Sequence, residues 1–97
     1  MMVAFIATLD IKAGREAEFE RLQTELSNIA HAEEPGLIVY DVIRNAADRR
    51  RYVVYARFRD RAAFELHQAA DFHERLVPPI LDCVDGEMDL RFYDWVG

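Results

Sequence analysis

The sequence predicts one α+β domain in which helices cover a four-stranded antiparallel sheet. Its 97 residues suffice for a single domain spanning residues 1–97. Four short segments rich in β-branched and aromatic residues indicate strands, and segments with helical periodicity lie between them. The resulting order, β-α-β-β-α-α-β, matches the split β-α-β arrangement of the ferredoxin-like fold, with its second helix in two pieces.

The first strand and helix follow from their apolar patterns. Residues 3–9 are apolar at nearly every position, which is typical of a strand covered on both faces. From Arg15 onward, large apolar side chains recur every three or four residues, at Phe19, Leu22, Leu26 and Ile29. The helix must end by Glu34, because Pro35 disfavours helical geometry in the residue before it.

The middle of the chain predicts a hairpin and two short helices. Residues 37–44 and 51–58 form the second and third strands. Asp60 is a suitable N-cap for the helix that carries His67. Asp71, with Glu74 three residues later, resembles a capping box that restarts the helix. Pro78-Pro79 predicts a break further along it.

The last strand, residues 87–96, carries large apolar groups on both faces. Leu90 and Phe92 take one face together with Met88, whereas Tyr93 and Trp95 take the other. With helices on only one side of the sheet, a monomer would leave an extensive apolar face exposed. We therefore expect a homodimer packed sheet against sheet.

Charge and cysteine content limit the partners and the compartment. The net charge of −6 excludes nucleic acid and an anionic membrane surface as partners, because both require a basic surface. The single Cys83 cannot form an intrachain disulfide, which fits a reducing cytoplasm. No segment is long enough to cross a membrane, and the first residues lack the basic region of a signal peptide. These features predict a cytoplasmic protein.

Several motifs together resemble one known family. They are Glu34-Pro35-Gly36 followed by Tyr40, Phe58-x-Asp60 followed by Ala63-x-x-x-His67, and the closing Phe92-Tyr93-Asp94. In order and spacing they resemble the antibiotic biosynthesis monooxygenase (ABM) domain of the dimeric α/β-barrel superfamily, over nearly the whole chain. The resemblance implies a dimer, a cavity between helices and sheet, and cofactor-independent oxidation of a phenol or hydroquinone to a quinone by O2.

The sequence also departs from the family pattern. Members often carry Ser three residues after the helix His, followed by His-Phe, whereas this chain has Ala70 and the reversed order Phe72-His73. The haem-degrading branch uses an Asn, a Trp and a later His where this chain has Thr8, His67 and Val77. Haem degradation is therefore not expected.

His67 is the candidate catalytic residue. A cofactor-free oxygenase needs a base, hydrogen-bond donors and an apolar cavity, because the substrate itself must supply the electrons. His67 suits the base; Tyr40 and Tyr55 suit the orientation of a substrate oxygen, and Phe64 and Trp95 suit an aromatic wall. The alternative is a buried structural His67 with the tyrosines as ordinary sheet residues.

The remaining polar residues predict no metal site. Six residues separate His67 from His73, which places them on different faces of one continuous helix, and His31 lies in another element. Glu34 is interpreted as a solvated helix end rather than as a buried acid.

Two other functions remain open at this stage. One is isomerisation of a small hydroxy-carbonyl compound in the same cavity, with His67 transferring the proton. The other is a non-catalytic dimeric domain that binds a small aromatic or quinol-like ligand. Fold alone does not separate these functions.

Overall fold

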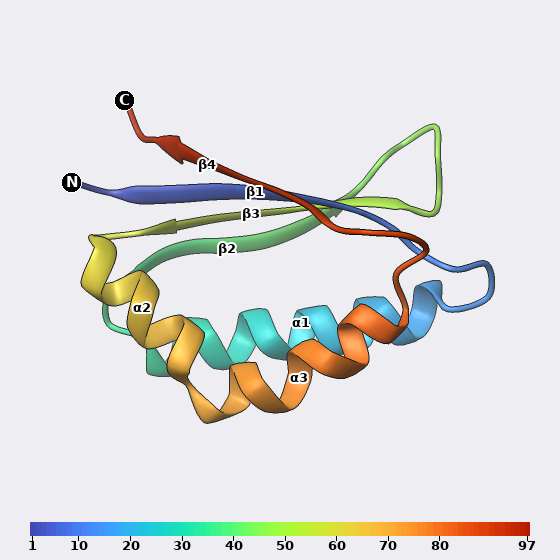
Figure 1. Cartoon of the computed structure of the whole chain (residues 1–97), viewed down its shortest axis with the longest axis horizontal. Helices are drawn as coiled ribbons and strands as arrows, with labels where there is room; N and C mark the ends of the chain where they lie inside the picture. Colours follow the sequence, from blue (N-terminus) through green and yellow to red (C-terminus); the bar gives the residue numbers. More distant parts are fainter.

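A computed structural model describes residues 1–97, and its elements follow the predicted order. They are β1 (Val3–Asp10), α1 (Glu16–Glu33), β2 (Leu37–Arg44), β3 (Arg51–Phe58), α2 (Arg61–Ala69), α3 (Asp71–Asp82) and β4 (Asp89–Asp94). The sheet order is β2-β3-β1-β4, and every neighbouring pair is antiparallel. All three helices lie on one side of the sheet (Figure 1). The predicted ferredoxin-like α+β fold is confirmed.

Strand alternation divides the side chains between an inner face, toward the helices, and an outer face. On β1 and β3 the inner positions are almost completely buried: Phe5, Ala7, Leu9, Tyr52, Val54, Ala56 and Phe58. Phe19 of α1 packs on Tyr52 with ring centroids 4.7 Å apart. The period of two in the strands and the apolar stripe of α1 thus build one core between the two layers.

The outer face has no covering element. Arg57 lies on this face, and its guanidinium sits 4.5 Å from the centre of the Trp95 ring. Ile43 is 62% exposed, Tyr93 48% and Trp95 42%. This is the apolar face from which the sequence predicts a dimer. None of the three helices combines the length and the apolar character that a membrane crossing requires.

Two expectations about α3 are wrong. The helix continues through Pro78 and Pro79 without a break. Pro78 and Pro79 have no N–H, so the carbonyls of Glu74 and Arg75, four residues earlier, have no helical hydrogen-bond partner. Both residues are exposed, so water can donate to those carbonyls. The capping box does not form either, because the residue that caps α3 is Ala70 and the cap has no side-chain hydrogen bond. Asp71 and Glu74 instead occupy the first turn, where the helix dipole favours their charge.

Asp60 is the N-cap of α2, as predicted. Its carboxylate accepts a hydrogen bond of 2.8 Å from the backbone N–H of Ala63. β4 is shorter at both ends than the predicted residues 87–96.

Gly36 makes a close contact that joins the start of β2 to α2. A Cβ added at Gly36 would lie 2.4 Å from the Cβ of Ala63. We expect Gly36→Ala to lower the free energy of unfolding by about 1–3 kcal/mol, because the helix must move away from the strand. Urea denaturation measures this change. Combining it with Ala63→Gly removes the overlap, so the double variant is expected to lose less stability than the two single changes summed. Simple additivity would contradict this packing.

Candidate functional site

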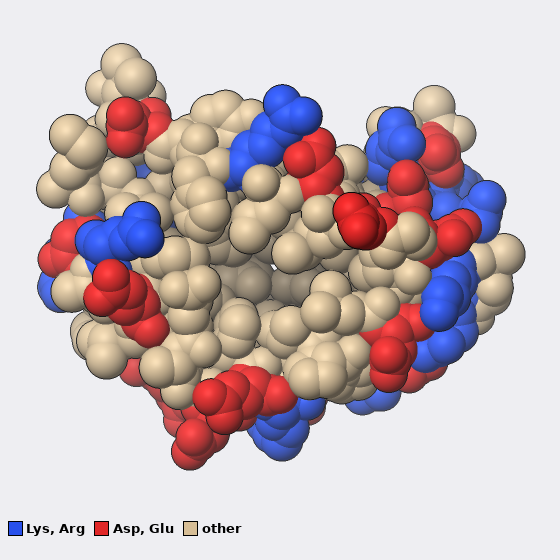
Figure 2. Space-filling view, viewed as in Figure 1, with Lys and Arg blue, Asp and Glu red and all other residues tan.

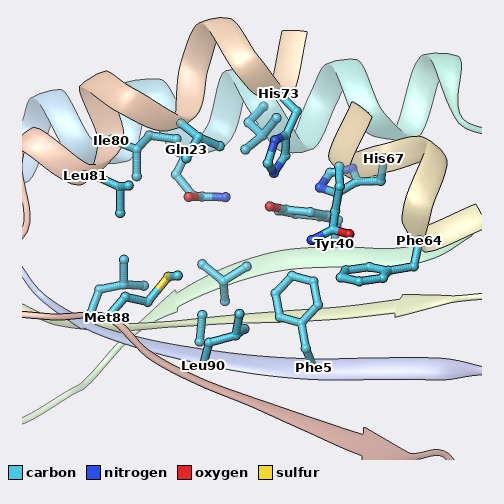
Figure 3. Close-up of a pocket in the computed structure, with 16 residues that line it drawn as sticks. Phe5, Gln23, Tyr40, Phe64, His67, His73, Ile80, Leu81, Met88 and Leu90 are labelled. Atoms are coloured by element: carbon cyan, nitrogen blue, oxygen red, sulfur yellow. The ribbon is translucent and has the colours of Figure 1, made fainter. Parts of the chain in front are cut away.

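A cavity of about 210 Å³ lies between the sheet and the helices. Figure 2 shows the cavity as a hollow at the centre of the face of the molecule turned toward the viewer, lined by uncharged residues. Phe5, Met88 and Leu90 make its lower side apolar, whereas Gln23, His67 and His73 come from the helices opposite and the ring of Tyr40, from β2, lies beside them (Figure 3). An apolar cavity of about 150 Å³ suffices to bind benzene, so this one has room for a small aromatic ligand.

α2 places His67 at the wall of this cavity. The Asp60 cap sets the phase of the helix, so that Ala63, Phe64 and His67 face the core. His67 is 1% exposed and lies between two aromatic rings, with 5.1 Å from its ring centroid to that of Tyr40 and 5.1 Å to that of Phe58. Phe64 also lines the cavity, as predicted for an aromatic wall.

Glu34 is a buried partner of His67, which corrects its interpretation as a solvated helix end. Its Oε2 lies 2.7 Å from Nδ1 of His67, and its side chain is only 11% exposed. Glu34 caps the C-terminus of α1 in an extended conformation that Pro35 enforces. This turn directs the carboxyl inward, while the close packing of Gly36 on Ala63 holds the turn against α2.

Burial shifts both members of the pair toward their neutral forms. It raises the pKa of Glu34 to about 7, and the nearby Glu33 carboxylate acts in the same direction. It lowers the pKa of His67 to about 4. Near neutral pH, Glu34 therefore changes protonation while His67 stays uncharged.

The protonation of Glu34 determines which nitrogen of His67 carries hydrogen. When Glu34 is ionised, its Oε2 accepts from Nδ1–H, and Nε2 presents a free lone pair. When Glu34 is protonated, its O–H donates to Nδ1, and the hydrogen of the ring sits on Nε2. Nε2 is buried and has no protein partner. His67 is thus equipped to act as a base only in the first state.

Tyr40 and Gln23 add hydrogen-bonding groups to the same wall. Burial raises the pKa of Tyr40 to about 12, so its hydroxyl keeps its proton. Gln23 comes from the buried face of α1, and its Nε2 is a buried donor near the Tyr40 hydroxyl that makes no hydrogen bond of good geometry. This buried amide was not predicted as a site residue, because it lies within the mainly apolar stripe of α1 and is neither an acid, a base nor an aromatic residue.

His73 lies next to His67, contrary to the expectation from their spacing. The ring centroids are 4.7 Å apart, in an edge-to-face arrangement. The six-residue separation misleads because the helix is not continuous: Ala70 adopts an extended conformation, and α3 turns His73 back toward α2. Burial lowers the pKa of His73 to about 4, and the neighbouring His67 acts in the same direction. No group of three or more His, Cys, Asp or Glu side chains is arranged to hold a metal ion.

Tyr55 and Trp95 do not join this site. Tyr55 alternates with the buried Val54 and Ala56 of β3, so its side chain lies on the outer face of the sheet. Trp95 follows β4 and stacks with Arg57 on the same outer face. The predicted cavity role of these two residues is therefore not compatible with their positions in one chain, whereas Tyr40 and Phe64 line the cavity beside His67.

The sequence matches a family model along most of its length. The model is that of the antibiotic biosynthesis monooxygenase (ABM) family, and the match covers residues 2–78. The chain belongs to this family. The motifs from Glu34 to His67 lie inside the matched region, so the predicted resemblance is confirmed.

Solved structures agree with the family assignment. A protein from Caulobacter crescentus, named only provisionally as an antibiotic biosynthesis monooxygenase, superimposes with a TM-score of 0.94 at 25% identity, over 99% of this ABM chain and 91% of its own. Another antibiotic biosynthesis monooxygenase gives a TM-score of 0.88 at 27% identity, covering 98% and 99%.

A third structure is similar in fold alone. It is SnoaB, a cofactor-independent oxygenase from Streptomyces nogalater, in its N63A mutant form. Its TM-score is 0.85 at 19% identity, and the superposition covers 97% of this chain and 92% of SnoaB. A comparison with curated protein sequences finds no significant match. Membership of the ABM family supports a monooxygenase-type activity for this chain.

Proposed function

We propose that this ABM domain is a cofactor-independent monooxygenase that oxidises a small phenol or hydroquinone to a quinone with O2. One observation carries the proposal: His67 binds Glu34 through Nδ1 and keeps an unpartnered Nε2 at the wall of an apolar cavity. This arrangement is an oriented base beside an apolar cavity. The oxygenase activity named for SnoaB, whose fold is similar, is consistent with it.

The proposed reaction begins with removal of a proton from the substrate. Nε2 of His67 accepts the phenolic proton, and the resulting anion donates electrons to O2. The ring supplies four electrons in total. One oxygen atom forms a new C–O bond at a ring carbon that carried hydrogen, and the other leaves as water with two hydrogens from the substrate. No external electron donor is needed for this balance.

The unpaired outer face supports a homodimer as part of the same proposal. Large apolar side chains on this face are about half exposed, among them Ile43, Tyr93 and Trp95. Packing this face against the same face of a second copy buries, away from water, an apolar surface that is too extensive for a monomer. Sedimentation equilibrium is expected to give twice the mass of the 11.3 kDa chain. A mass of one chain at micromolar concentration would contradict the dimer.

Oxygen uptake tests the function directly. Chelator-treated protein without added flavin is mixed with a panel of hydroquinones and naphthols, and uptake is compared with the spontaneous rate. Enzyme-dependent uptake is the expected result. Turnover of a hydroxy-carbonyl compound without uptake would favour an isomerase, and ligand binding without any turnover would favour a binding domain.

The rate should rise with pH through the titration of Glu34. Below about pH 7 this carboxyl is protonated and Nε2 of His67 carries hydrogen, so the fraction of active enzyme falls tenfold for each pH unit. Above about pH 7 the base form dominates and the rate levels off. The measurement is kcat/KM between pH 5.5 and 8.5, with the spontaneous rate subtracted at each pH. A rate that stays constant from pH 5.5 to 8.5 would contradict the role given to Glu34.

A further inference from the structure

Gln23 is a buried polar residue that the proposed proton transfer does not use. It is 3% exposed, and its Nε2 makes no hydrogen bond of good geometry within the protein, although the amide lies close enough to the Tyr40 hydroxyl to act against the rise in the pKa of Tyr40. Leaving a buried amide donor unpaired costs free energy of the order of a lost hydrogen bond. Gln23 lies on the buried face of α1. The other residues on this face are mainly apolar or small: Phe19, Leu22, Leu26, Ser27 and Ala30.

The surroundings of Gln23 show where a partner would come from. Gln23 lines the cavity, and its amide points toward the hydroxyl of Tyr40 (Figure 3). Tyr40 lies between Gln23 and His67 along the helix side of the cavity, opposite the apolar Phe5 and Leu90. Two of the polar groups at the cavity thus lie on either side of Tyr40: the base at His67 and the amide of Gln23.

We propose that Gln23 is a substrate-binding residue whose amide donates a hydrogen bond to a second oxygen of the substrate, while His67 binds the first. This inference rests on the proposed function for its substrate class and makes that class more specific. The preferred ligand is a neutral, small aromatic compound with an oxygen at each end of its ring, either a hydroquinone or a hydroxy ketone. A phenol with a single oxygen leaves the Gln23 donor unpaired. No Lys or Arg lines the cavity, so an anionic substituent finds no counter-charge there.

A matched pair of stable ligands tests this assignment without any turnover. The ligands are 4-hydroxyacetophenone and 4-ethylphenol, which share the phenol and differ in the acceptor oxygen at the other end. Their affinities are measured by isothermal titration calorimetry under nitrogen. The unchanged protein is expected to prefer the ketone by about threefold to tenfold, the range of one neutral hydrogen bond.

Gln23→Met keeps the length of the side chain and removes the donor. It should abolish the preference and leave the affinity for 4-ethylphenol within about twofold. Its thermal stability should be unchanged or raised, because an unpaired buried donor is removed. Gln23→Leu serves as a second variant if the first does not fold. Gln68→Met changes the other glutamine that lines the cavity, an exposed one, and should retain the preference.

Equal affinities in the unchanged protein, or a preference that survives Gln23→Met, would overturn the assignment. Because these affinities are measured without O2, they are independent of the oxygenase proposal. Oxygen uptake with no ketone preference would contradict only the role of Gln23. A preference without oxygen uptake would contradict only the reaction.

Discussion

Replacing His67 by Ala is expected to lower kcat/KM for oxygen uptake by about 100-fold to 10,000-fold, the usual contribution of a positioned general base. The reason is that Nε2 of His67 is the one basic nitrogen at the cavity wall whose other ring nitrogen is held by a carboxyl group. Oxygen-electrode traces under saturating O2, with the spontaneous rate subtracted, give the ratio. An uptake rate within threefold of the unchanged protein would leave the reaction in place and remove His67 from it.

The His67 variant needs two controls because this side chain is part of the core. Truncation of a fully buried ring leaves a cavity, so part of the activity loss would reflect lower stability. His67→Gln keeps more of the volume, and circular dichroism shows whether each variant is folded. His31→Ala, at an exposed position near the end of α1, should leave the rate unchanged at pH 8, where Glu34 is ionised even without the His31 charge that lowers its pKa. A similar loss in the His31 variant would indicate a general effect of losing histidine.

Replacing Glu34 by Gln is expected to lower kcat/KM by about 10-fold to 100-fold at pH 8. An amide can donate to Nδ1 of His67 as readily as accept from it. The His67 tautomer with a free lone pair on Nε2 is therefore no longer favoured over the tautomer with hydrogen on Nε2. The pH inflection near 7 should also disappear, because Gln does not titrate. The profile of kcat/KM against pH measures both effects.

Glu33→Gln is the matched control for this change. Glu33 precedes Glu34 on the same helix, carries the same charge and is exposed. Its removal should lower the pH inflection slightly, since the Glu33 carboxylate helps to raise the pKa of Glu34, and should leave the rate at pH 8 unchanged. An inflection that persists in Glu34→Gln would assign the titration to another group.

The strands, α1 and the fold were predictable because their signals are local. The apolar stripe of α1 and the Pro35 stop define that helix, and the alternation of β3 separates buried Val54 from Tyr55. This alternation also predicts that Tyr55 points to the face of the sheet away from His67. Tyr55 was nevertheless predicted as a site residue because it is aromatic. The continuation of α3 through Pro78 and Pro79 was not predictable, because it depends on tertiary packing of Leu76 and Ile80.

The site was predictable only in part, since it joins elements distant in sequence. His67 and Phe64 share one helix, and their face follows from the Asp60 cap. The Glu34–His67 pair links the end of α1 to α2 across 33 positions, and helix periodicity does not specify such a contact. The proximity of His73 depends on the change of direction at the extended Ala70, which the sequence indicated only as a helix restart.

Labelling with ¹⁸O2 shows whether the protein inserts oxygen into its substrate. Chelator-treated protein without flavin is incubated with the panel substrate that gives the fastest uptake, and the quinone is trapped by reductive acetylation before mass spectrometry. One ¹⁸O atom is expected in the product, the other in water, with one O2 consumed per quinone. Quinone without label, accompanied by hydrogen peroxide, would show that the protein does not insert oxygen and would contradict the proposed monooxygenase.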